Sequence, residues 1–195
     1  MREAKIDRKT KETEISLYLN LDGNGCCDID TGCGFLDHML ELLSNHSRFD
    51  LTVKCHGDVK VDYHHTVEDV GICFGTAFKE ALNDKKGITR YADVTIPMDE
   101  ALVLCAIDIS GRSYLLYDLI LKQSKVGDFD TELVEEFFWG FCRTALVTLD
   151  FIQLAGKNTH HIIECAFKAF ARALKNAVKI DESLNGKIPS SKGVL

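Results

Sequence analysis

The chain has 195 residues, of which 46% are apolar and 27% charged, a globular composition that excludes disordered and low-complexity classes. Its 23 basic and 30 acidic residues give a net charge of −7, which disfavours a nucleic-acid partner. No apolar run approaches the roughly 20 residues of a membrane-spanning helix, and the charged N-terminus does not resemble a secretory signal. We therefore expect a cytoplasmic protein without a membrane partner, whose eight cysteines are reduced and buried.

The first half of the chain is predicted to alternate strands and helices. Apolar residues recur at every second position over residues 15–21, which indicates a strand, and the sequence DGNG at 22–25 indicates a turn after it. Apolar residues at helical spacing predict a helix over residues 35–43. A strand over residues 50–55 and a second helix over residues 64–82 follow.

The second half begins with three predicted strands, over residues 94–97, 101–109 and 114–121. Two segments with helical periodicity come after them, over residues 131–147 and 160–178. Strands and helices therefore occur in both halves of the chain.

The two halves also share an internal repeat. A shift of 96 positions aligns identical residues in the two halves, among them Thr52 with Thr148, His64 with His160, His65 with His161, Glu68 with Glu164 and Phe74 with Phe170. The strand-helix-strand order is expected twice, with helices packed on one face of mostly antiparallel sheet, which is an α+β fold. We predict a single pseudo-symmetric domain over residues 1–195, with half-repeats of about 1–92 and 93–195.

Each half carries the motif His-His-x-x-Glu at the start of a predicted helix, at residues 64–68 and 160–164. Adjacent side chains of a helix point about 100° apart, so the two histidines of one motif cannot easily share an ion. Each motif is therefore expected to offer ligands to two ions, in a two-metal site. Imidazole and carboxylate donors suit Mn, Fe, Zn, Co or Ni. The alternative, helix capping or surface histidines, is less consistent with two matched copies.

Three other histidines lie outside these motifs. His38, near the start of the first predicted helix, is either a further metal ligand or a histidine of the core. His46 and His56 have no comparable context, and we interpret them as structural.

Several basic residues are candidates for a phosphate site, namely Arg90, Arg112, Lys168 and Lys192. Lys168 follows Glu164 by four residues, so on a helix it projects close to the metal-binding face. The segment SSKG at 190–193 has the donor groups of an anion-binding loop, although such a tail is also typical of a flexible terminus.

Seven stretches form an ordered series, namely GFLDHML at 34–40, HHTVED at 64–69, DEAL at 99–102, DISGR at 108–112, HHIIE at 160–164, FKAFAR at 167–172 and PSSKGVL at 189–195. In this order they resemble the imidazoleglycerol-phosphate dehydratase family of histidine biosynthesis, over nearly the whole chain. The resemblance implies a duplicated fold like domain 2 of ribosomal protein S5 and two manganese ions per site. It also implies a homo-oligomer of 24 subunits built from trimers, with sites between subunits.

The resemblance assigns roles residue by residue. The implied metal ligands are His38, His64, His65, Glu68, His160, His161 and Glu164. The implied contacts of the substrate phosphate are Arg90, Arg112, Lys168, Ser190 and Lys192. Glu12 is implied to lie near the substrate hydroxyls, and the implied catalytic residues are Glu12, His65 and Glu164.

Two positions depart from the family pattern. Asp150 stands where a histidine is expected to complete a metal shell, and we retain it as a predicted oxygen ligand. Tyr63 stands where an aspartate is common, which we expect to matter less.

The implied reaction converts imidazole glycerol phosphate into imidazole acetol phosphate by loss of water. A metal-stabilised imidazolate expels the adjacent hydroxyl and leaves a diazafulvene-like intermediate. Loss of a proton from the next carbon then gives the enol, which becomes the ketone, with Glu12 or a metal-bound water as base or acid. Two alternatives use the same residues: a two-metal phosphoester hydrolase and a structural metal site in a binding module.

Overall fold

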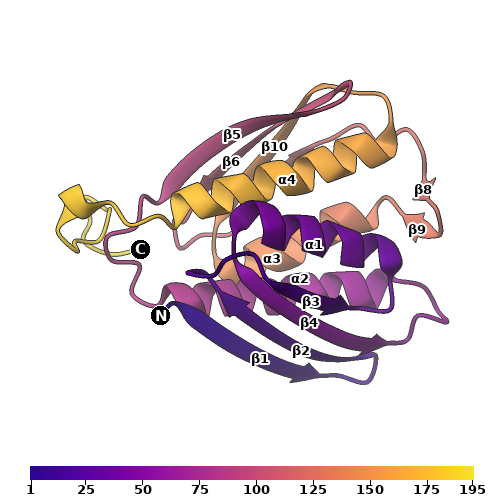
Figure 1. The fold of residues 1–195 in the computed structure, drawn as a ribbon, viewed down its shortest axis with the longest axis horizontal. Coiled ribbons are helices and arrows are strands. Elements are labelled where there is room, and N and C mark those ends of the chain that lie inside the picture. Colours follow the sequence, from indigo (N-terminus) through magenta and orange to yellow (C-terminus); the bar gives the residue numbers. More distant parts are fainter.

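The computed structural model describes all of residues 1–195, as two four-stranded sheets that enclose a layer of four helices (Figure 1). The first sheet has the strand order β1-β2-β4-β3 and carries α1 (Gly34–Ser47) and α2 (His64–Leu82). Its strands are β1 (Glu3–Lys9), β2 (Thr13–Asn20), β3 (Cys27–Asp30) and β4 (Asp50–Gly57). β3 runs parallel to β4, whereas the other neighbours are antiparallel.

The second sheet repeats this arrangement with the order β5-β6-β10-β7, in which only β7 and β10 are parallel. Its strands are β5 (Tyr91–Met98), β6 (Ala101–Asp108), β7 (Tyr114–Asp118) and β10 (Thr148–Ala155), and its helices are α3 (Leu133–Ala145) and α4 (Thr159–Ala177). A small hairpin of β8 (Lys125–Val126) and β9 (Phe129–Asp130) is added before α3, and a short 3-10 helix (Glu182–Leu184) follows α4.

These elements confirm the predicted α+β class with a duplicated half-domain. Each sheet packs its helices on one face, and the helices meet in the middle as the pairs α2 with α3 and α1 with α4. A single core of 51 buried residues spans both halves. β1 and β3 were not predicted, and the predicted boundary near residue 92 falls inside β5, which begins at Tyr91.

No helix is both long and apolar enough to span a lipid bilayer. All eight cysteines are free thiols, and six of them are buried. Cys26 and Cys27 are exposed, because they lie in the turn and the edge strand that precede α1. The expectation of burial is therefore wrong for these two cysteines.

Glycines allow α2 and α3 to approach closely. A Cβ atom at Gly71 would overlap the carbonyl oxygen of Phe137, and a Cβ atom at Gly140 would lie 2.8 Å from the carbonyl oxygen of Glu68. Thr144 of α3 donates a hydrogen bond of 3.0 Å to the carbonyl oxygen of Ile72 across the same contact. The position of the motif on α2 therefore depends on this backbone contact.

Replacing Gly71 with alanine is expected to lower the free energy of unfolding by about 1–3 kcal/mol, because the helices must separate to admit the methyl group. Gly34→Ala is the matched control, since a Cβ atom there meets nothing within 4 Å. Urea denaturation of both variants measures the difference. Equal unfolding free energies for Gly71→Ala and the wild type would contradict the packing argument.

Candidate active site

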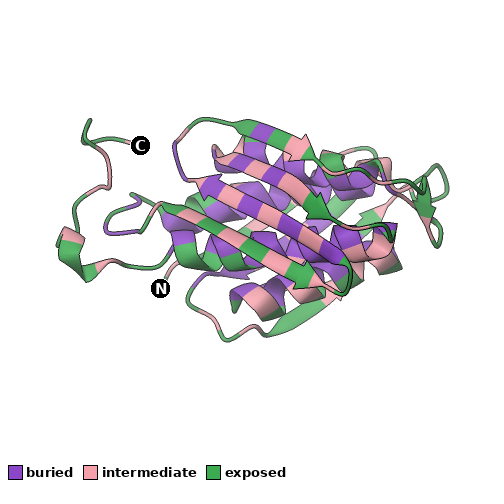
Figure 2. Cartoon of the chain, turned by 90° about the horizontal axis from the view of Figure 1, so that it is seen from above, coloured by how far each residue is buried: buried purple, intermediate pink, exposed green.

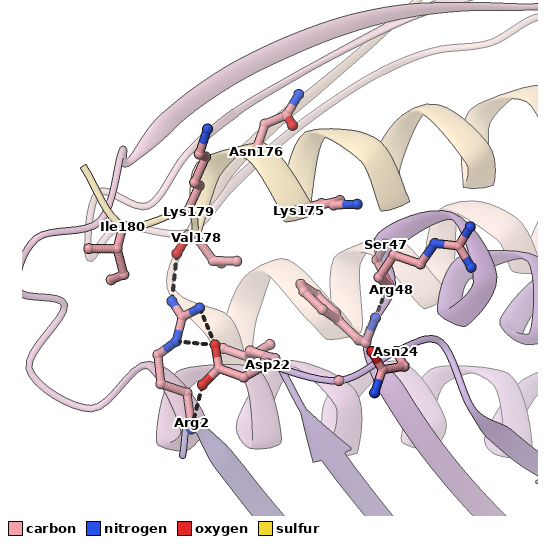
Figure 3. A pocket seen from close by; sticks show the side chains of 13 residues that line it. Arg2, Asp22, Asn24, Ser47, Arg48, Lys175, Asn176, Val178, Lys179 and Ile180 are labelled. Carbon is pink, nitrogen blue, oxygen red and sulfur yellow. Dashed lines mark hydrogen bonds and ion pairs between the residues drawn. The ribbon is translucent and has the colours of Figure 1, made fainter. Parts of the chain in front are cut away.

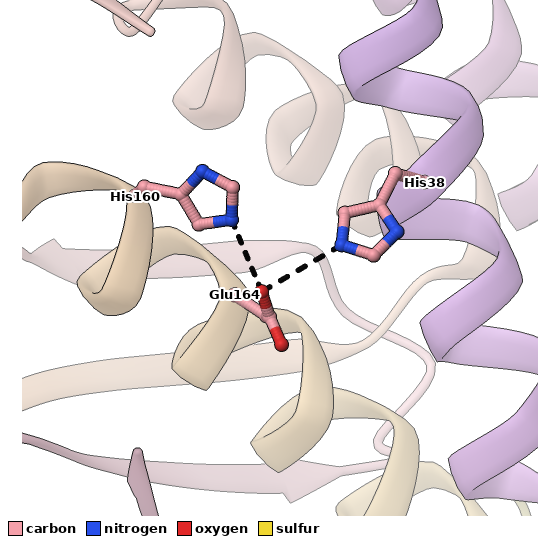
Figure 4. Close-up of side chains that lie close together, drawn as sticks. All are labelled: His38, His160 and Glu164. Atoms are coloured by element: carbon pink, nitrogen blue, oxygen red, sulfur yellow. Dashed lines mark hydrogen bonds and ion pairs between the residues drawn. The ribbon is translucent and has the colours of Figure 1, made fainter. Parts of the chain in front are cut away.

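Three side chains converge where the first two turns of α1 and α4 meet (Figure 4). The Nε2 atom of His160 lies 3.1 Å from Oε2 of Glu164, and the Nε2 atom of His38 lies 3.6 Å from the same oxygen. Their ligand atoms are all within 4.8 Å of one another. Two imidazole nitrogens and a carboxylate fit a divalent transition metal, so His38 joins the predicted ligands of the second motif rather than the core.

The start of α4 is fixed by a helix cap. The side-chain oxygen of Asn158 accepts hydrogen bonds from the backbone N–H groups of His160, at 2.9 Å, and His161, at 3.3 Å. This cap holds the two histidines of the motif on the first turn. Their rings are nearly perpendicular, with an interplanar angle of 84° and centroids 6.3 Å apart, so they face different directions.

Glu164 is the buried member of the cluster, with 9% of its side chain exposed. The Nζ atom of Lys168 lies 2.6 Å from its Oε1 atom. Burial alone raises the pKa of Glu164, but the hydrogen bonds from Lys168 and His160 outweigh burial and leave the pKa below its usual value. The carboxylate is therefore ionised and suited to bind a cation.

The first motif lies at the start of α2 and does not join this cluster within the chain. His64 Nε2 lies 3.9 Å from Glu68 Oε2, and Arg143 Nη1 lies 3.8 Å from Glu68 Oε1. The rings of His64 and His65 stand at 87°, as in the second motif. No second group of three or more ligands converges as closely as His38, His160 and Glu164.

The second histidine of each motif contacts a carboxylate to which sequence analysis gave no role of its own. His161 Nδ1 lies 2.8 Å from Glu100 Oε2, and His65 Nδ1 lies 3.0 Å from Asp58 Oδ2. The hydrogen bond to Glu100 raises the pKa of His161, and the hydrogen bond to Asp58 raises the pKa of His65. Glu100 and Asp58 belong to loops that the sequence repeat does not relate, so the repeat gave no signal for them.

Glu12 and Tyr63 both lie beside the first motif. Glu12 is exposed in the turn between β1 and β2, and its carbonyl oxygen accepts a hydrogen bond of 3.0 Å from the N–H group of Asp58. The charge of Glu12 contributes to the raised pKa of His65. Tyr63 precedes α2 and donates a hydrogen bond of 2.7 Å to Asp128, which raises the pKa of its phenol to about 12.

Four of the predicted phosphate contacts gather at the C-terminal end of α4. The Arg90 guanidinium donates to Asp108 Oδ1 at 2.7 Å and to the carbonyl oxygen of Pro189 at 2.8 Å, and so holds the tail that carries Ser190 and Lys192. Gly111, next to Arg112, contacts the last residue of the same tail. These four residues therefore share one end of the molecule.

Lys168 lies apart from the other four, beside Glu164. The Arg90 N–H group donates to the carbonyl oxygen of Ala177, the last residue of α4, whereas His160 is the second residue of that helix. The rise of about 1.5 Å per residue separates the two helix positions by about 25 Å. One chain therefore cannot present its cluster of His38, His160 and Glu164 and its Arg90 region to the same small ligand.

Asp150 lies on the outer face of the second sheet, away from the cluster of His38, His160 and Glu164, so its role as a metal ligand stays a prediction. Its neighbours Leu149 and Phe151 are fully buried against the helices, so strand alternation turns Asp150 the other way. It pairs there with Ala106 and the exposed Leu116. Burial raises the pKa of its carboxyl group.

A cavity of about 790 Å³ lies near the C-terminal end of α4, and none of the predicted site residues lines it (Figure 3). Arg2, Arg48, Lys175 and Lys179 line it. Arg2 is itself held by Asp22 and by the carbonyl oxygen of Val178. Cavity size therefore does not identify the histidine cluster, which is an open surface site.

The fold and the histidine cluster define a class of protein: a duplicated α+β domain in which two matched helix starts present histidine and carboxylate groups suited to divalent metals.

Comparison with known proteins identifies the particular family. The sequence profile described as imidazoleglycerol-phosphate dehydratase matches residues 31–174. Proteins of that name from Azorhizobium caulinodans and Caldanaerobacter subterraneus are each 56% identical to this chain over all of its 195 residues. The match covers 99% of the Azorhizobium protein and 100% of the Caldanaerobacter protein. The chain belongs to the imidazoleglycerol-phosphate dehydratase family.

Solved structures agree with this assignment. The dehydratase from Staphylococcus aureus has a TM-score of 0.84 at 41% identity, over 92% of this chain and 99% of its own. The Pyrococcus furiosus enzyme, solved in complex with (S)-C348, has a TM-score of 0.84 at 37% identity, over 97% and 100%. The chain is therefore an enzyme of the hydro-lyase class, and the hydrolase and binding-module alternatives have no support.

Proposed function

We propose that this enzyme dehydrates imidazole glycerol phosphate to imidazole acetol phosphate, a step of histidine biosynthesis, in the cytoplasm. The observation that carries the proposal is the cluster of His38, His160 and Glu164, on a chain that matches named dehydratases over its full length. Its nitrogen and carboxylate donors suit binding of both a metal and an imidazole-containing substrate.

We further propose Mn²⁺ as the cofactor, with two ions per active site. His38, His160 and Glu164 would hold one ion, and the remaining motif ligands would come from His64, His65, Glu68 and His161. When bound, the ions supply Lewis-acid stabilisation of negative charge on the imidazole ring. Lys168 keeps Glu164 ionised and places an ammonium group beside the reacting end of the substrate.

In the proposed reaction, the ring loses its N–H proton and the adjacent carbon loses its hydroxyl, so that water leaves and a diazafulvene-like species forms. The following carbon then loses a proton while the ring nitrogen regains one, which gives the enol, and transfer of the enol O–H proton to carbon gives the ketone. Glu12 is exposed and close to His65, so its carboxylate is available to move a proton there. Arg90, Arg112, Ser190 and Lys192 would bind the phosphate and fix the position of the reacting carbons.

The proposed active site requires two copies of the chain, since the metal cluster and the Arg90 region are at opposite ends of α4. A second feature supports association. The outer face of the second sheet carries apolar side chains that are not fully buried (Figure 2), among them the half-buried Leu102, Leu104 and Ile152 and the exposed Leu116. We propose a homo-oligomer with shared active sites, of 24 subunits built from trimers.

Product analysis tests the proposed reaction. Metal-stripped enzyme is incubated with imidazole glycerol phosphate, with and without Mn²⁺, while the ketone and free phosphate are measured together. We expect ketone formation that depends on Mn²⁺ and no phosphate release. Phosphate release would contradict dehydration, and ketone formation at full rate in metal-stripped enzyme would contradict the metal requirement.

A further inference from the structure

The two His-His-x-x-Glu motifs differ in the surroundings of their paired histidines. The first histidines, His64 and His160, approach the glutamate of their own motif through Nε2. The second histidines, His65 and His161, instead direct Nδ1 at a carboxylate from a neighbouring loop. No comparable carboxylate contacts Nδ1 of His64 or His160.

Glu100 is rigidly placed for its contact with His161. It lies in the turn between β5 and β6, and its Oε1 atom accepts hydrogen bonds from the backbone N–H groups of Lys157, at 3.2 Å, and Asn158, at 2.8 Å. Its Oε2 atom faces His161 Nδ1 at 2.8 Å. Both carboxylate oxygens of Glu100 therefore have defined partners, and Oε2 is the one that faces the histidine. Asn158 also caps α4, so Glu100 is tied to the helix start that carries His161.

Asp58 makes the corresponding contact in the first half, from a different place in the fold. It follows β4, and its two carboxylate oxygens lie 3.0 and 3.2 Å from His65 Nδ1. The shift of 96 residues that relates the motifs would place Leu154 opposite Asp58 and Ala4 opposite Glu100. The two carboxylates are therefore not copies of one ancestral residue, yet both contact the same atom of equivalent histidines.

Resting on the metal-dependent function proposed above, we infer that Glu100 and Asp58 are positioning residues. Each accepts a hydrogen bond from the Nδ1–H group of the second histidine of one motif. The Nε2 atom of that histidine is thereby left unprotonated and able to bind a metal. A neutral imidazole carries its proton on one nitrogen, and a carboxylate can only accept it. The orientation of ligand histidines by carboxylates strengthens metal binding in proteins. The other ring nitrogen of His161, Nε2, lies 3.8 Å from Oδ2 of Asp99, so a second carboxylate lies near the proposed ligand atom.

Glu100→Gln separates this role from a merely structural one. The glutamine oxygen keeps the hydrogen bonds from Lys157 and Asn158, so its NH₂ group faces His161 Nδ1 and donates to it. The histidine proton then moves to Nε2, the ligand atom. Asp58→Ala tests His65 by removing the acceptor, since both Asp58 oxygens face His65 Nδ1 and an asparagine is free to turn its oxygen there. Glu14→Gln, an exposed carboxylate paired with Lys9, is the control.

The measurement is calorimetric titration of Mn²⁺ into the metal-stripped full-length protein, together with the thermal midpoint of the metal-free form. We expect each test variant to bind Mn²⁺ about 10- to 100-fold more weakly than wild type, with an unchanged metal-free midpoint and an unchanged control. If the wild type binds Mn²⁺ and the test variants bind it with an affinity within twofold of the wild type, the inference is overturned and the proposed function remains intact. Absence of Mn²⁺ binding by the wild type would overturn both.

Discussion

Glu164→Gln is expected to lower turnover by about a thousandfold or more and to weaken Mn²⁺ binding in the same variant. Glu164 contributes the shared oxygen of the cluster, to which both His38 and His160 are directed. A loss of about 4 kcal/mol of charge stabilisation corresponds to a thousandfold in rate. Glutamine has the size of glutamate but no charge, so the ionic contact with Lys168 is lost as well.

Steady-state turnover and metal content of the purified variant measure this effect. Glu182→Gln, in the exposed segment after α4, is the control, and we expect it to match the wild type. A Glu164→Gln enzyme that kept its manganese and its full rate would show that the cluster is not the metal site.

Arg90→Ala is expected to lower kcat/KM by about 30-fold to several thousandfold, mainly through KM. Truncating a charged group that binds a phosphate typically costs 2–5 kcal/mol. Arg90 also anchors the tail through Pro189, so the variant loosens Ser190 and Lys192 together with the guanidinium. The metal cluster is about 25 Å away along α4, so Mn²⁺ affinity should not change.

The separation of these two effects is itself measurable. Titration with Mn²⁺ and substrate kinetics on the same preparation distinguish phosphate binding from metal binding, and Arg172→Ala, an exposed arginine of α4, serves as the control. An Arg90→Ala enzyme with unchanged KM, or with weakened Mn²⁺ binding, would contradict the role of this arginine.

The periodicity of apolar residues predicts the long helices well and the edge strands poorly. α2 matches its prediction at both ends, because its buried stripe is continuous from Val67 to Leu82. β1 escapes prediction because each of its residues is at least partly exposed and its inner face ends in Arg8, which pairs with Asp69 of α2 at 2.8 Å. A charged residue on the inner face interrupts the alternation of apolar and polar residues by which a strand is predicted.

The candidate site shows a similar division. The repeat identifies both histidine motifs, since each motif is local and lies on one helix turn. Glu100 and Asp58 were not predicted to contact the histidines, because they reach them through tertiary contacts that no spacing encodes. The buried neighbours Leu149 and Phe151 show that Asp150 faces outward from the sheet, but they do not test whether it binds a metal.

Subunit mixing tests directly whether two chains share one active site. The Glu164→Gln and Arg90→Ala enzymes are dissociated, mixed in equal amounts and reassembled. The control is the same procedure with the Glu164→Gln enzyme and an enzyme that carries both substitutions. Random assembly of shared sites gives about one site in four with both residues intact, so at substrate concentrations far below the wild-type KM we expect about a quarter of wild-type turnover from the mixture and almost none from the control. Turnover of the mixture no higher than that of either variant alone would contradict the account, because it would mean that each site is built within one chain.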